Sequence, residues 1–124
     1  ARRGDLDEAL RWARPLCEEG RLQVLPELAP RLQRARRMPE LASLLGAAVR
    51  SFDDGAPADL RADLAAVLAL QGDAEGARFH GVRAAAAGNR RVGSVLRWVA
   101  RHHPEAAARS DAAAWARSVD PERR

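Results

Sequence analysis

The most constraining feature of this 124-residue chain is a short helix-start pattern that occurs twice. The first copy, Gly4-Asp5-Leu6-Asp7-Glu8-Ala9, begins at residue 4, and the second, Gly72-Asp73-Ala74-Glu75-Gly76-Ala77, begins 68 positions later. A weaker copy, Met38-Pro39-Glu40-Leu41-Ala42, lies between them. The separation is twice the length of one helical hairpin repeat of roughly 34 residues. The spacing therefore predicts an array of helical hairpins, which presents a surface rather than performing chemistry.

Composition favours closely packed helices over a thicker architecture. Apolar residues make up 47% of the chain, but alanine dominates that share, isoleucine is absent, and the only aromatic residues are three Trp and two Phe. Because alanine buries little surface, such a core is stable where thin helices approach closely over many contacts. No alternating β-branched pattern or hairpin turn indicates a strand. We expect an all-α chain of antiparallel helical hairpins stacked as a short α-solenoid, with a compact helical bundle as the alternative.

Apolar stripes at helical spacing predict about seven helices joined by short loops. They fill a single domain, residues 1–124, which could also be a segment of a larger protein. Asp5 and Asp73 are expected to cap two of the helices, and Gly20 and Gly72 to end two others.

Prolines and small residues mark the irregular places. Pro26 and Pro30 predict either a broken second helix or a short turn followed by a helix from about Pro26. The run at 53–57 predicts a loop. Small side chains recur on one face of the fifth helix, at Ala77, Gly81, Ala84 and Gly88. Since glycine inside a helix costs up to about 1 kcal/mol relative to alanine, this face predicts very close packing of another helix.

The Gly-Asp turns resemble those of the tetratricopeptide repeat family, in which two antiparallel helices per repeat stack into a superhelix. In that family the second helix opens after such a turn, with a small residue five positions on. Gly4-Asp5 with Ala9 and Gly72-Asp73 with Ala77 fit this arrangement. The resemblance covers the second helix of two units, and the Trp-x-x-Leu-Gly-like pattern of the family's first helix is not visible. It implies a non-enzymatic scaffold that captures a peptide or helix of a partner protein.

No residue pattern indicates catalysis, a cofactor or a metal. His80, His102, His103 and Cys17 lack the paired spacing of a zinc site. We expect His102 and His103 to satisfy the last carbonyls of a helix, and Cys17 to be a small core residue. Phosphate-binding glycine loops and the serine-hydrolase and zinc-protease motifs do not occur. An enzyme is not expected, and no catalytic, cofactor-binding or metal-ligating residue is predicted.

The candidate partner-binding residues are arginines and one tryptophan. All 21 basic residues are arginine, which a GC-rich genome explains, and 17 acidic residues leave a net charge of only +4. At i, i+7 and i+11, Arg90, Arg97 and Arg101 are expected to share a helix face. The three tryptophans fall off or at the edge of the apolar stripes, where they either pack between helices or contact a partner. The predicted binding residues are Arg34, Arg37, Arg90, Arg97, Trp98 and Arg101.

Three functions stay open at this point. The first is a protein-interaction scaffold that binds a protein or peptide, and an acidic partner would suit the arginines best. The second is nucleic-acid binding through the same arginines, which the interspersed acidic residues disfavour. The third is self-association through the alanine-rich last helix. The single cysteine fits a reducing compartment, and no apolar run is long enough to span a membrane, so we expect a cytoplasmic protein.

Overall fold

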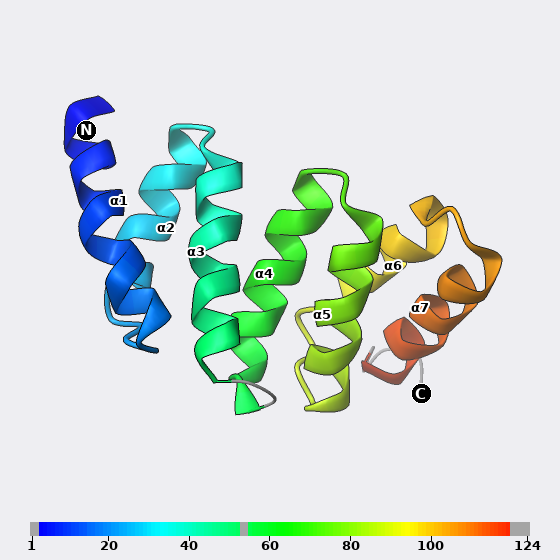
Figure 1. Ribbon diagram of the computed structural model, residues 1–124. Helices are drawn as coiled ribbons and strands as arrows, with labels where there is room; N and C mark the ends of the chain where they lie inside the picture. Colours follow the sequence, from blue (N-terminus) through cyan, green and yellow to red (C-terminus); the bar gives the residue numbers. More distant parts are fainter. Residues whose placement is uncertain (1–2, 53–54, 120–124) are drawn as a thin grey trace. The chain divides into compact units, whose positions relative to one another are not determined.

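The chain is folded from α-helices in the part that the structure, a computed structural model, describes: residues 3–52 and 55–119. Seven helices follow one another in these ranges, and no strand occurs in them (Figure 1). They are α1 (Arg3–Glu18), α2 (Leu25–Arg34), α3 (Met38–Ser51), α4 (Ala58–Leu70), α5 (Ala74–Ala86), α6 (Gly93–His102) and α7 (Ala106–Val119). The predicted all-α class and the seven helices are confirmed. None of these helices is both long enough and apolar enough to cross a bilayer.

The chain divides into two compact units, Ala1–Ala56 and Pro57–Arg124. The first unit holds α1, α2 and α3, and the second holds α4 to α7. The single domain expected from the sequence, residues 1–124, stays a prediction.

In the first unit, α1 packs mainly on α3, and α2 contacts both of them. The most deeply buried side chains come from all three helices: Leu6, Ala13, Cys17, Leu28, Leu32, Leu41, Leu44, Leu45 and Ala48. A turn followed by a helix from about Pro26 is confirmed, because α2 begins at Leu25. The alternative, a break at Pro30, does not occur. The three buried leucines of α2 share one face, and their burial outweighs the one backbone hydrogen bond that Pro30 cannot donate.

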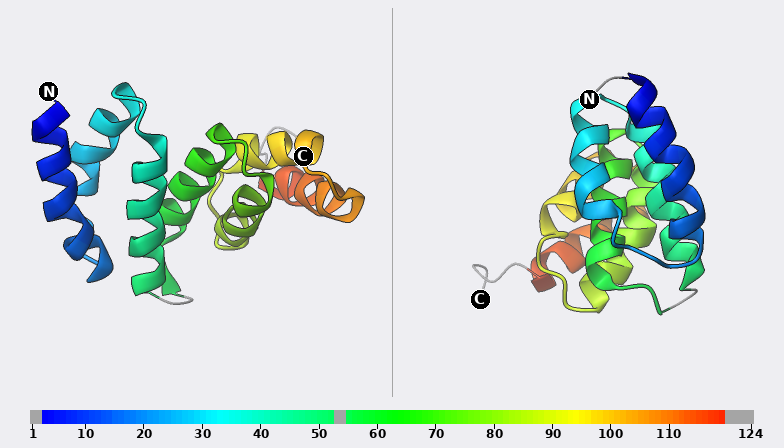
Figure 2. Two further views of the ribbon diagram at one scale, coloured as in Figure 1. Left: turned by 45° about the horizontal axis from the view of Figure 1, so that its top comes forward. Right: turned by 90° about the vertical axis from the view of Figure 1, so that its left-hand side faces the viewer.

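In the second unit, α4 pairs with α5 and α6 pairs with α7, as two consecutive hairpins (Figures 1 and 2). The core between them is made mainly of alanine and valine. A Cβ atom added at Gly81 of α5 would lie 3.0 Å from Cδ2 of Leu96 and 3.5 Å from Cγ2 of Val92. The predicted close approach of another helix is therefore confirmed at Gly81, and that helix is α6.

Four of the helices end in the same way, by a backbone turn with one residue in the left-handed conformation. In this turn the N–H after that residue bonds back to the carbonyl five positions earlier, at 2.8–3.0 Å. The left-handed residues are Gly20 after α1, Arg36 after α2, Gly72 after α4 and Gly88 after α5. Gly88 therefore ends α5 rather than continuing its row of small residues, which corrects that part of the prediction.

The helix starts agree with the sequence at Asp73 and differ at Asp5. The carboxylate of Asp73 accepts a hydrogen bond from the N–H of Gly76 at 2.9 Å, so the predicted cap of α5 is confirmed. Asp5 does not cap α1, because α1 begins at Arg3 and Asp5 lies within its first turn. The helix dipole still favours a negative charge there. Residues 53 and 54 of the predicted loop lie outside the described residues, and 55–57 are not part of an α-helix.

Replacing Gly72 with alanine is expected to lower the free energy of unfolding by about 1 kcal/mol. Gly72 has φ of +81°, and no atom lies within 4 Å of a Cβ built on it, so the cost comes from the backbone alone. Gly55→Ala is the matched control, because its Cβ would also meet nothing within 4 Å and its φ is not positive. Urea denaturation of the two variants measures the difference. Equal midpoints for both would contradict the assigned turn.

Replacing Gly81 with valine is expected to destabilise the second unit by about 1–3 kcal/mol, because the added methyl groups overlap Leu96. Leu96 is completely buried, so it cannot turn out into solvent without losing its core contacts. Thermal unfolding followed by circular dichroism tests this. Ala86→Val, at an exposed position of the same helix, is the comparison that accounts for the lower helix propensity of valine. A loss no larger than that of Ala86→Val would show that α5 and α6 are not in close contact.

Candidate functional site

Two of the predicted binding arginines lie on one side of α6. Arg97 and Arg101 are exposed and stand four residues apart, so their side chains share a face of the helix. We call the surface formed by Arg97 and Arg101 the α6 arginine face. Arg90 is also exposed, but α6 begins only at Gly93. The helical spacing that placed Arg90 on the same face therefore does not apply, and that prediction is wrong.

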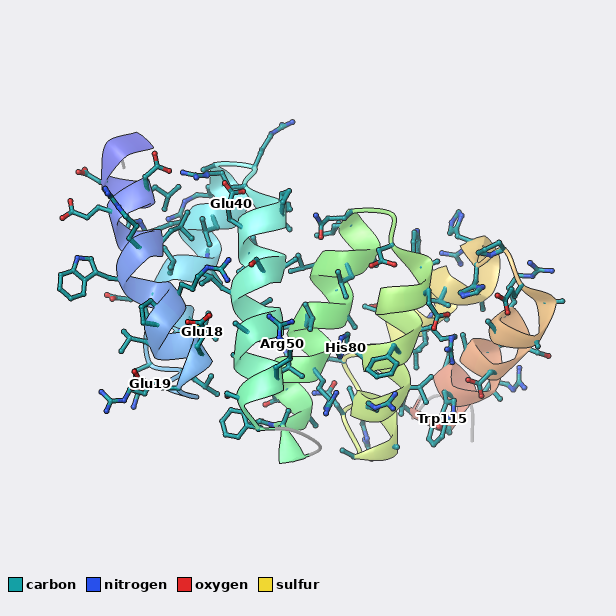
Figure 3. All side chains as sticks on the ribbon, in the orientation of Figure 1. Glu18, Glu19, Glu40, Arg50, His80 and Trp115 are labelled. Atoms are coloured by element: carbon teal, nitrogen blue, oxygen red, sulfur yellow. The ribbon has the colours of Figure 1, made fainter. Side chains whose placement is uncertain are left out.

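Trp98 is half-buried and packs against the core of its own unit. The centroid of its ring lies 5.0 Å from that of His102, with 35° between the ring planes. Packing within the protein therefore accounts for Trp98. Trp115 on α7 packs against the same core, and its position is labelled in Figure 3. The exposed tryptophan is Trp12 on α1, at 72% relative exposure, and the sequence pattern did not single it out.

The start of α6 is attached to α4 by Asn89 and Arg91. The side-chain oxygen of Asn89 accepts from the N–H of Val92 at 3.2 Å, and its amide nitrogen donates to Asp59 at 2.6 Å. Arg91 lies 3.4 Å from a carboxylate oxygen of Asp59 and 3.8 Å from one of Asp63. Asn89 is buried, so its hydrogen bond with the N–H of Val92 is protected from water, whereas its partner Asp59 is exposed. The first turn of α6 is thereby fixed.

The end of α6 is held by His103, which is buried at 3% relative exposure. Its Nδ1 accepts from the backbone N–H of Glu105 at 3.0 Å, so the ring proton is on Nε2, which donates to Glu75 of α5 at 2.8 Å. The ring of His103 therefore does not satisfy the last helix carbonyls, as the sequence led us to expect. The chain turns into an extended conformation at His103 and directs the ring toward α5 instead.

Glu75 also forms two hydrogen bonds with Arg78, at 2.9 Å and 2.6 Å. The bonds from Arg78, and next the bond from His103, lower the pKa of Glu75 from 4.5 to about 2. Arg78 lies 3.7 Å from Asp111 of α7, and Arg109 of α7 donates to the carbonyl of His103 at 2.7 Å. These contacts join α5, α6 and α7 near the connection between α6 and α7.

The segment that contains the α6 arginine face is rich in arginine and lacks acidic residues. No aspartate or glutamate occurs between Glu75 and Glu105, whereas six arginines do. Any carboxylate near this segment must therefore come from a residue outside it. Arg78 and Arg91 have such partners, in Glu75, Asp111, Asp59 and Asp63. Arg90 and Arg101 form no ion pair with any described residue.

Arg34 and Arg37, the other two predicted binding residues, lie in the first unit. Arg37 bonds to Asp7 of α1 at 2.5 Å and to Glu40 of α3 at 2.7 Å, so it joins these helices. Arg34 is exposed at the end of α2, where it borders a depression of about 180 Å³ with Arg31 and Leu6. The negative end of the helix dipole stabilises Arg31 and Arg34 there. Contacts within the first unit and the dipole of α2 therefore explain the positions of Arg31, Arg34 and Arg37, and no binding partner is needed to explain them.

A larger groove of about 400 Å³ lies between α1 and α3 of the first unit. Its apolar floor includes Leu10, Pro15 and Leu44. The charged residues at its border balance one another: Arg11, Arg14, Glu18 and Glu40, of which Glu18 and Glu40 are labelled in Figure 3. Arg14 is also hydrogen-bonded to Ser43 of α3. These border charges sum to zero, so they favour neither an acidic nor a basic partner.

The candidate metal ligands and the candidate nucleophile are not assembled into a site. No group of three or more His, Cys, Asp or Glu side chains in the described ranges is placed to hold an ion. Cys17 is completely buried, as predicted, and burial raises the pKa of its thiol. A buried thiol of raised pKa is a poor nucleophile, because the reactive form is the thiolate.

His80 of α5, labelled in Figure 3, is half-buried beside two arginines. Its Nδ1 lies 3.5 Å from Nη1 of Arg61, and its ring meets that of Phe79 edge-on at 5.0 Å. Arg83 lies over the Phe79 ring, 3.7 Å from its centroid. Burial, followed by the charges of Arg61 and Arg83, lowers the pKa of His80 from 6.5 to about 4. His80 is therefore neutral at neutral pH.

Comparisons of the chain with protein-family models, with curated proteins and with solved structures find no match. The resemblance to the tetratricopeptide repeat family accordingly stays a prediction.

The low pKa of His80 predicts a pH-dependent stability. Below about pH 6.5 the unfolded chain binds a proton at His80 that the folded chain does not bind until about pH 4. The free energy of unfolding should therefore fall as the pH is lowered through this window, and His80→Gln should reduce that fall. Urea denaturation of both proteins at neutral pH and near the lower limit measures the two slopes. Identical slopes would mean that His80 is not shielded in the folded state.

Proposed function

We propose that this chain is a cytoplasmic, non-enzymatic protein-interaction module, built from tetratricopeptide-like helical hairpins, that binds an acidic helix or peptide at the α6 arginine face. The observation that carries the proposal is the pairing of the arginines. Arg37, Arg78 and Arg91 have carboxylate partners within the protein. Arg101 of this face has none among the described residues, and neither has Arg90, which precedes α6.

Arg90 has a position that folding alone does not favour. It precedes the first turn of α6, where the helix dipole carries its positive end, and a second cation is unfavourable by a few tenths of a kcal/mol or more. Arg91 stands at the same end but is compensated by Asp59 and Asp63. The uncompensated charge of Arg90 is consistent with a carboxylate supplied by a partner.

The aromatic residue beside the arginines favours a protein partner over a nucleic acid. Proteins that bind single strands without sequence preference stack bases on exposed aromatic rings. Trp98 is half-buried, and one side of its ring is occupied by His102. Arginine pairs with carboxylates in a bidentate geometry, which needs no aromatic platform.

The proposal is tested with a fluorescein-labelled helical peptide that carries glutamate pairs four residues apart on an alanine background. Arg97→Glu/Arg101→Glu is expected to weaken binding by at least about tenfold, because like charges then face each other. Fluorescence anisotropy at about 50 mM salt gives the dissociation constants.

The matched control is Arg50→Glu/Arg117→Glu, which changes the net charge equally at exposed positions of α3 and α7. It should bind the peptide as the wild type does. Equal loss in both variants would attribute binding to net charge alone and would reject the α6 arginine face. A labelled DNA oligonucleotide that binds more tightly than the peptide, with an affinity that collapses steeply with added salt, would instead identify a nucleic-acid-binding domain.

A further inference from the structure

The first unit presents a face whose chemistry is opposite to that of the α6 arginine face. Asp5, Glu8 and Trp12 stand at i, i+3 and i+7 of α1, so they lie on one side of this helix. All three are exposed, and Trp12 is among the most exposed large apolar side chains of the described residues. We call this surface the α1 acidic face.

The two carboxylates of this face are available for a partner. Asp7, on the neighbouring side of α1, is bound to Arg37. Asp5 and Glu8 form no ion pair or hydrogen bond with another described residue through their carboxylates. An exposed tryptophan next to free carboxylates is typical of a binding surface, because Trp supplies large contact area and the charges supply orientation.

The spacing of the two faces matches in an antiparallel register. Trp12 follows Asp5 by seven residues on α1, and Ser94 precedes Arg101 by seven residues on α6. Both intervals correspond to about 10 Å along a helix axis. With Asp5 opposite Arg101, Glu8 lies near Arg97, and Trp12 lies over Ser94. Ser94 is small and exposed, so it leaves room for an indole.

We propose that the acidic helix bound at the α6 arginine face is the α1 acidic face of a second copy of this chain. The inference rests on the proposed function, because it assigns a partner to the same α6 surface. The two faces differ from each other, so each contact joins the α1 acidic face of one copy to the α6 arginine face of another. Self-association should therefore increase with concentration.

Sedimentation velocity of the wild type, at concentrations up to about 1 mM and at low salt, is expected to show association that added salt reverses. Two variants reverse the charge of one face each: Asp5→Arg/Glu8→Arg and Arg97→Glu/Arg101→Glu. Each variant alone presents like charges on both faces, so its dissociation constant should rise by at least about tenfold. An equimolar mixture of the two variants restores opposite charges and should associate again.

Recovery in the mixture also shows that both variants are folded, and circular dichroism of each checks this independently. Two further variants add no positive charge at the start of α1: Asp5→Asn/Glu8→Gln and Trp12→Ala. Each should also raise the dissociation constant of self-association. A wild type that stays monomeric over the whole range would overturn the proposal. So would association that survives both reversals, as expected for contact through the alanine-rich α7, or a mixture that fails to recover.

The acidic peptide separates this proposal from the proposed function. Asp5→Arg/Glu8→Arg keeps the α6 arginine face, so it should bind the peptide as tightly as the wild type does. Peptide binding without self-association would refute only the second copy as the partner. If the wild type does not bind the peptide, the proposed function itself fails.

Discussion

The rest of this structure depends on the backbone turn that ends its helices. At the end of α1, α2, α4 and α5 the last carbonyls are satisfied by the chain's own next N–H groups, with one residue in the left-handed conformation. A turn of this kind reverses the chain within a few residues, so the next helix can pack against the one before it. Because most of the core side chains of the second unit are alanine or valine, the helices must come close for burial to stabilise them. Close packing of these helices therefore requires both the backbone turn and the small side chains.

Much of this architecture can be predicted from residues that act on their neighbours in sequence. Gly72 ends α4 and Asp73 caps α5, because both act within one helical turn. Arg36 occupies the left-handed position after α2, where glycine is the usual residue, so composition gives no signal for that turn. The continuation of α2 through Pro30 also depends on tertiary packing, namely the burial of its leucines.

The candidate site was less accessible to sequence reasoning, because its residues act over long separations. His103 bonds to Glu75, 28 residues away, and Arg37 bonds to Asp7, 30 residues away. Neither pair can be recognised without the fold, although each decides whether a side chain faces a partner or its own protein. The placement of Arg97 and Arg101 on one face of a helix needed only helical spacing. Placing Arg90 correctly requires the residue at which α6 begins, which the sequence does not show. Predicting that Trp12 is exposed requires knowing which side of α1 is covered by other helices.

The attachment of α6 at both ends has a thermodynamic consequence for any ligand of that helix. Asn89 holds its first turn to α4, and His103 holds its last turn to α5. The backbone that carries Arg97 and Arg101 is thus ordered before a ligand arrives, and no loop must fold on binding. The entropy lost on association then comes from the arginine side chains and from the ligand, and a partner that is itself a formed helix contributes little to that loss. Rigid helices that meet through paired charges also associate quickly, so the lifetime of such a complex is governed by how well its side chains exclude water once it has formed.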